Sequence, residues 1–274
     1  MKRNFIVLIL LFPLMLCAQA QTMNSWDGAS ISPNSHIRTL NIYVNIIYNV
    51  HPDMDNIFGD TTYWGPVKDS LKEGINVSGT IPTYLLSLFD TAYIIGNTSG
   101  CITRVYGESS FDSLQILGDN IVVNVRESRV IADPTPPLSD YCQTSPFCFN
   151  KIKKVAIDII NEAGGLQTVY GHDSLSDYAL PGKNSIFYTN VLIRNITSAY
   201  GGINSGSGFS GRTIQNLKIG SQYYSSEKGT LQCVGDGNIS TNPTSIVAHE
   251  ISHSFFGGNS FHTSGGNHRG SSET

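Results

Sequence analysis

The pattern of hydrophobic and polar residues predicts five strands. In the segment that begins at Arg38, the residues Leu40, Ile42, Val44 and Ile46 alternate with polar or aromatic positions and share one face. The other candidates are equally rich in β-branched residues or lie between turn residues. The predicted strands are 38–50, 120–128, 185–195, 213–220 and 229–237.

Helical spacing predicts a long helix over residues 149–165. Ile152, Val155, Ile159 and Ile160 recur on one side of it, Asn150 can cap its first turn, and Gly164 can end it. A shorter helix is expected after Pro82, where leucines and Phe89 could form a buried side. No internal repeat is present.

A third helix is predicted over residues 244–256. Asn242 or Thr244 provides an N-cap, Pro243 suits a first turn, and Val247 and Ile251 belong to an apolar stripe. The glycine- and serine-rich segment 199–211 is expected to be a loop, either a flexible linker or a loop near substrate. Together these elements predict an α+β fold in one domain.

The first twenty residues have the features of a signal peptide. Lys2 and Arg3 precede an apolar stretch over 5–16, and the small residues of 18–20 suit cleavage after Ala20. We therefore expect a polar leader over 21–35 and a catalytic domain over 36–274. No later apolar run is long enough to span a membrane, so the mature protein is expected to be secreted, into the periplasm or the medium.

Composition excludes some classes of function and leaves others open. The chain has 274 residues, a formal net charge of −4 and no basic cluster, so a nucleic-acid partner is not expected. Four cysteines remain after signal removal: Cys101, Cys142, Cys148 and Cys233. In an exported protein an even number favours disulfides. Three pairings are possible, and Cys142 and Cys148 are close enough in sequence to close a small loop.

The strongest chemical signal lies in the third predicted helix, which reads HEISH from His249 to His253. Residues four apart stand on one face of a helix, so these two imidazoles could share one Zn²⁺ ion at about 2.0–2.1 Å each. Glu250 would lie beside the metal, where it could take a proton from a zinc-activated water. The alternative is that these histidines are ordinary surface or core residues.

A catalytic zinc site needs a third protein ligand and an open position. Gly257 and Gly258 can end the helix, and His262 is the first donor after that turn, so we expect His262 to be the third ligand. His268 is a second candidate. Glu273 is a third, at the spacing used when the ligand is a glutamate on a following helix, although the glycines between disfavour that helix.

The segment HEISHSFFGGNSFHTSGGNH, together with RTLNIYVNIIYN and VYGHDSLSDY, resembles metzincin-like zincin metalloproteases secreted by Bacteroidetes-type bacteria. The resemblance implies a twisted mixed sheet, a backing helix over 151–163 and an active-site helix over 244–256. It also implies His249 and His253 as ligands and Glu250 as general base. Two features depart from that family. Asn259 stands where metzincins place the third histidine, and no methionine follows Met54 to form their methionine turn.

These observations predict an exported zinc endopeptidase that acts on protein or peptide substrates. The missing methionine turn and the absence of a closing element after Thr263 lead us to expect a C-terminally truncated chain. The alternative is therefore a truncated or degenerate zincin that binds metal or peptide without cleaving it.

Overall fold

The computed structural model describes twelve stretches of the chain. These are residues 35–52, 72–75, 88–91, 100–111, 113–131, 137–138, 142, 147–166, 185–194, 207–210, 213–234 and 247–252. The predicted signal peptide, most of the leader and the helix expected after Pro82 lie largely or wholly outside these residues.

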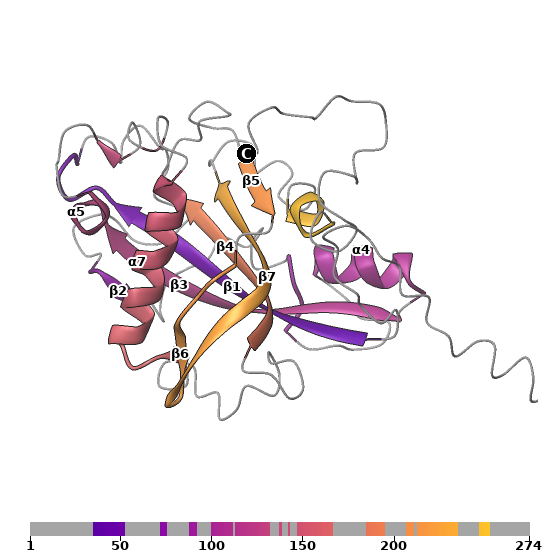
Figure 1. The fold of residues 1–274 in the computed structure, drawn as a ribbon. Helices are drawn as coiled ribbons and strands as arrows, with labels where there is room; N and C mark the ends of the chain where they lie inside the picture. Colours follow the sequence, from indigo (N-terminus) through magenta and orange to yellow (C-terminus); the bar gives the residue numbers. More distant parts are fainter. Residues whose placement is uncertain are drawn as a thin grey trace, which may run out of the picture.

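A mixed seven-stranded sheet forms the centre of the described fold, in the order β2-β3-β1-β4-β7-β5, with β6 paired to β7 (Figure 1). The four central strands β3, β1, β4 and β7 run parallel, whereas β2, β5 and β6 pair antiparallel. The strands are β1 (Ser35–Ile47), β2 (Gly74–Ile75), β3 (Leu114–Arg126), β4 (Ser185–Arg194), β5 (Ser207–Ser210), β6 (Leu217–Ile219) and β7 (Gln222–Val234). The described fold is α+β, as predicted.

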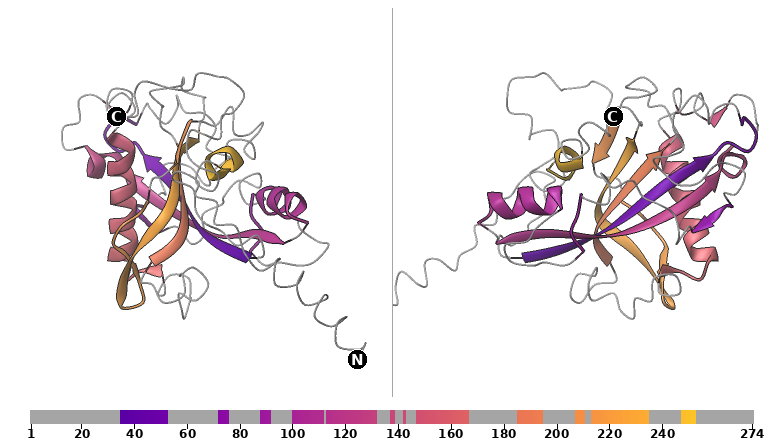
Figure 2. Two further views of the ribbon diagram at one scale, coloured as in Figure 1. Left: turned by 45° about the vertical axis from the view of Figure 1, so that its right-hand side comes forward. Right: turned by 180° about the vertical axis from the view of Figure 1, so that it is seen from behind.

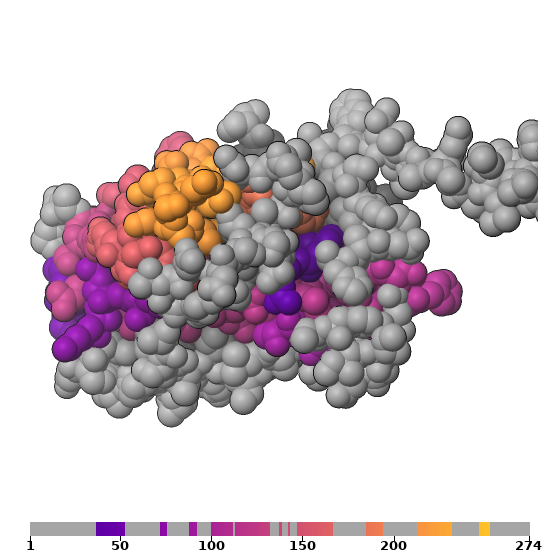
Figure 3. Space-filling model, turned by 90° about the horizontal axis from the view of Figure 1, so that it is seen from below, coloured from indigo at the N-terminus to yellow at the C-terminus, as the bar shows by residue number. Residues whose placement is uncertain are grey.

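Helices cover both faces of this sheet (Figure 2). α7 (Cys148–Glu162) packs on one face, and α4 (Cys101–Ser109) and the helix at residues 247–252 lie on the other. A short helix, α5 (Glu127–Val130), follows β3. Seen from below, α4 and the β6–β7 hairpin lie at opposite ends of the molecule (Figure 3).

Apolar side chains of β1 point to both faces of the sheet, so both faces must be covered by helices. Leu40, Ile42 and Val44 enter the core beneath α7, while Tyr43, between them, enters the core beneath α4 and residues 247–252. Successive side chains of a strand point to opposite faces, and a parallel sheet is normally buried on both. The predicted strand was therefore correct, although it begins three residues earlier than expected.

α7 confirms the predicted helix, although its last residue is Glu162, two residues before Gly164. Ile152, Val155, Ile159 and Ile160 are all buried. Gly165 has φ +92°, and its N–H donates to Ile160 O at 2.9 Å. A Cβ on Gly165 would lie 2.7 Å from Lys218 O, so the close contact between this turn and β6 also requires glycine.

Two predictions about the remaining elements need correction. Residues 207–210 form edge strand β5 rather than loop, because Ser207–Ser210 pairs antiparallel with β7. Long-range pairing of this kind leaves no local signal in a glycine- and serine-rich sequence. The segment 229–237 does contain a strand, but β7 begins at Gln222 and ends at Val234.

A buried carboxylate joins the ends of β1 and β3. Glu127 has 0% relative exposure and accepts hydrogen bonds from the backbone N–H groups of Val50, His51 and Leu138. His51 Nδ1 lies 2.8 Å from Glu127 Oε1. His51 has the appearance of a surface residue in the sequence, and its side chain is 26% exposed, but its ring contacts the buried carboxylate of Glu127.

A row of polar side chains crosses the sheet on the face that carries α4. Asn41 Nδ2 donates to Asn120 Oδ1 at 3.0 Å, Asn190 Nδ2 donates to Asn41 Oδ1 at 2.7 Å, and Thr230 Oγ1 donates to Asn190 Oδ1 at 2.7 Å. These residues are partners in the strand register. The row therefore ties four parallel strands at one level.

Cys142 and Cys148 form a disulfide with their Cα atoms 5.0 Å apart, whereas Cys101 is a free thiol. The structure thus contains the Cys142–Cys148 bond that the short sequence separation suggested. None of the described helices is long and apolar enough to cross a membrane.

Candidate metal centre

The predicted HEISH segment is helical over the residues that the structure describes, 247–252. Val247 and Ile251 are both 0% exposed and pack with Tyr43, Val122 and Leu192 of the sheet. These two residues are four apart and so form one side of the helix. Their burial fixes which side of the helix faces the core.

His249 lies on the other side of this helix. At 3.6 residues per turn it stands roughly 160° around the axis from both Val247 and Ile251, and its side chain is only half-buried. Glu250 lies on the flank between His249 and the core and is 8% exposed. Burying a carboxylate is costly, and such groups concentrate at functional sites.

Tyr106 of α4 supports the opposite flank of the helix. Its hydroxyl oxygen lies 2.8 Å from Ser252 Oγ and 3.2 Å from Ala248 O (helix 247–252 is yellow in Figure 1). Burial raises the pKa of Tyr106 to about 12, although the hydrogen bond with Ser252 acts in the opposite direction. The phenol is therefore neutral near pH 7 and retains its proton for hydrogen bonding.

The position of α4 depends on a close contact at its N-terminus. A Cβ on Gly100 would lie 2.4 Å from Asp90 N, and Gly100 N–H donates to Asp90 Oδ1 at 2.8 Å. Thr103 Oγ1 accepts from Asp90 N–H and donates to Ile116 O of β3. These contacts hold α4 against the sheet, so that Tyr106 reaches residues 247–252.

The structure describes two of the four residues predicted for the site. His249 and Glu250 lie in the described helix, whereas His253 and His262 lie outside the described residues, as do the alternatives His268 and Glu273. Within the described stretches, no three His, Cys, Asp or Glu side chains come together as a metal-binding group. The ligand set therefore stays a prediction.

Sequence reasoning missed α4 and Tyr106. The buried residues of α4, namely Ile102, Thr103, Tyr106 and Gly107, recur at helical spacing. That signal is present in the sequence but covers only nine residues, and short apolar patterns do not distinguish helix from strand. The contact between Tyr106 and Ser252 joins residues 146 positions apart, and no local pattern reports it.

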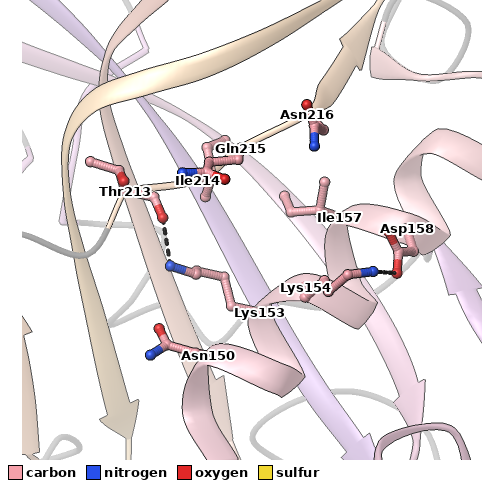
Figure 4. Close-up of a pocket in the computed structure, with 9 residues that line it drawn as sticks. All are labelled: Asn150, Lys153, Lys154, Ile157, Asp158, Thr213, Ile214, Gln215 and Asn216. Atoms are coloured by element: carbon pink, nitrogen blue, oxygen red, sulfur yellow. Dashed lines mark hydrogen bonds and ion pairs between the residues drawn. The ribbon is translucent and has the colours of Figure 1, made fainter. Parts of the chain in front are cut away.

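A cavity of about 380 Å³ lies away from this helix, between α7 and the segment 213–216 (Figure 4). Lys153 Nζ donates to Thr213 O, and Lys154 pairs with Asp158 at 2.7 Å. Both lysines are thus engaged within the protein. Because α7 and helix 247–252 cover opposite faces of the sheet, this cavity is separate from the candidate metal centre.

Comparison with known proteins identified no relative. No protein-family model, no curated protein and no solved structure matches the chain.

Proposed function

We propose that this protein is an exported zinc-dependent endopeptidase of the zincin type. The observation that carries the proposal is the helix at 247–252, in which burial of Val247 and Ile251 leaves His249 half-exposed and places Glu250 beside it. This is the arrangement that the H-E-x-x-H pattern requires of its first histidine and its glutamate.

The chemistry of the donors suits zinc. Neutral imidazole is a common zinc ligand, and His249, His253 and His262 would hold the ion, provided that the helix continues through His253. Zinc supplies a Lewis acid that lowers the pKa of a coordinated water toward neutrality and polarises a carbonyl group.

Glu250 would act as the general base in this mechanism. Its carboxylate would accept a proton from the attacking water and return it to the leaving amine as the peptide bond breaks. Val247 and Ile251 keep the helix against the sheet, and so keep the carboxylate next to His249.

The test is hydrolysis of casein and of a fluorogenic peptide library by the purified mature chain, with zinc content measured in the same samples. Glu250→Gln is expected to keep zinc and to lose at least about 100-fold in rate, the usual contribution of a general base. His249→Ala is expected to lose both zinc and activity. Glu108→Gln, on the exposed side of α4, is the matched control and should behave as wild type.

Two results would separate the possibilities. Full hydrolysis by Glu250→Gln would refute the assigned role of Glu250. A wild-type chain that binds zinc through His249 but cleaves nothing would instead identify a zincin that binds metal or peptide without cleaving it.

A further inference from the structure

We propose that Tyr106 is a positioning residue of the zinc site, holding helix 247–252 at the rotation that presents His249 to the metal. The inference rests on the proposed function and extends it to a residue outside the H-E-x-x-H segment. It is carried by the two contacts of the Tyr106 hydroxyl, to Ser252 Oγ and Ala248 O.

Apolar packing alone does not fix the rotation of the described helical segment 247–252 about its own axis. Val247 and Ile251 press one side of it against Tyr43, Val122 and Leu192, but hydrophobic contact is non-directional. A hydrogen bond has a preferred distance and angle, so it resists both rotation and sliding. Tyr106 provides such bonds on the flank formed by Ser252.

The contacts bracket His249 in the sequence. Ala248 directly precedes His249, and Ser252 directly precedes His253. The two contacts can form together if the Ser252 hydroxyl donates to the Tyr106 oxygen and the Tyr106 hydroxyl donates to the Ala248 carbonyl oxygen. One hydroxyl thus contacts the described helix at two points, one on either side of His249 in the sequence.

Zinc binding requires the ligand atoms to be placed accurately, so the rotation of the helix that carries His249 must be restrained. Side chains of a helix reach about 5–6 Å from its axis, so a rotation of 10° displaces their ends by about 1 Å. Zinc–ligand distances vary by only about 0.2 Å in well-formed sites. A small loss of rotational restraint therefore costs zinc affinity before it costs the fold.

The Tyr106 ring is itself anchored. It is 5% exposed and packs in the same core as Ile102 and Phe89. α4 carries it on a helix tied to β3 through Thr103. Replacing Tyr106 by phenylalanine would keep this packing and remove only the hydroxyl.

The experiment measures the zinc dissociation constant of the mature chain by competition with a chromophoric chelator at pH 7.5, beside thermal melts of the zinc-free proteins. Tyr106→Phe and Ser252→Ala are each expected to weaken zinc binding about tenfold or more, the range found for groups that orient metal ligands. The double variant should be little worse than Tyr106→Phe alone, because that change already removes the hydroxyl that Ser252 contacts. Ser252→Thr keeps a hydroxyl and should keep wild-type affinity.

Tyr48→Phe is the matched control. Tyr48 is 1% exposed, but it belongs to the core beneath α7, on the other face of the sheet. It should leave zinc affinity unchanged even if it lowers the melting temperature as much as Tyr106→Phe does.

The outcomes distinguish this inference from the proposed function. Wild-type zinc affinity in Tyr106→Phe, or an equal loss in Tyr48→Phe, overturns the positioning role while leaving the zinc site intact. Two results would overturn the proposed function and the positioning role together. One is a wild-type chain that binds no zinc, and the other is a His249→Ala variant whose zinc affinity equals that of wild type.

Discussion

Replacing Asn41 by leucine tests whether the polar row across the sheet stabilises the fold. Asn41 is 0% exposed and takes part in three hydrogen bonds, with Thr39, Asn120 and Asn190. Leucine has a similar size and shape, so the substitution changes hydrogen bonding more than volume.

The expected cost follows from the partners left behind. Asn190 is 0% exposed, and its Nδ2 group would lose the acceptor 2.7 Å away. A buried group left unsatisfied costs about 1–3 kcal/mol, and each further lost hydrogen bond about 1 kcal/mol. Asn120 is only partly buried and can turn to water. The free energy of unfolding should therefore fall by about 3 kcal/mol, which in a chain of this size lowers Tm by roughly 6–12 °C.

Asn45 provides a matched control on the same strand and face. It is 2% exposed, but among the described residues its Oδ1 has no hydrogen-bond partner, and its Nδ2 donates to Asn124 Oδ1 at 3.2 Å. Asn45→Leu removes one unsatisfied acceptor but leaves another, Asn124 Oδ1, without the Asn45 donor. The two effects roughly cancel, so the net change in the free energy of unfolding should stay within about 1 kcal/mol. Urea denaturation and thermal melts measure both variants. Equal losses for Asn41→Leu and Asn45→Leu would refute the reasoning.

Two further predictions concern buried ionisable groups. Burial raises the pKa of Tyr106 from its ordinary value of 10.0 to about 12 in the folded protein. As the pH rises, the unfolded chain therefore loses the Tyr106 proton before the folded chain does. The stability that neutral Tyr106 contributes is lost between pH 10 and pH 12. Wild type should lose about 2–3 kcal/mol more than Tyr106→Phe over that interval in urea titrations, and parallel curves would contradict this. Glu127→Ala should lower the free energy of unfolding by about 3–5 kcal/mol, because three backbone N–H groups and His51 lose their acceptor. Exposed Glu108→Ala should change it by less than about 0.5 kcal/mol, and a similar small effect of Glu127→Ala would show that the cluster contributes little.

The regular elements with strong local patterns could be predicted from the sequence. β1 alternates cleanly, and the isoleucine and valine residues predicted to form one side of α7 are all buried, so local preference and tertiary packing agree there. The helix at 247–252 was also expected, because Val247 and Ile251 repeat at that spacing.

Elements defined by distant partners could not be predicted in this way. β5 is a strand only because β7 lies beside it. Tyr106 belongs to the candidate site only because the chain brings α4 against residues 247–252. Glu127 and His51, 76 residues apart, look like exposed polar residues until the ends of β1 and β3 are placed side by side.

The polar row also constrains how this sequence can change over time. Sliding β1 by two residues along its neighbours would keep its inward and outward pattern, yet it would separate Asn41 from both Asn120 and Asn190 at once. Each member of the row depends on the next for its hydrogen-bond partner, so a single apolar replacement is costly whereas a joint replacement of neighbours need not be. Positions 41, 120, 190 and 230 should therefore accept substitutions together, and related sequences are expected to show them covarying.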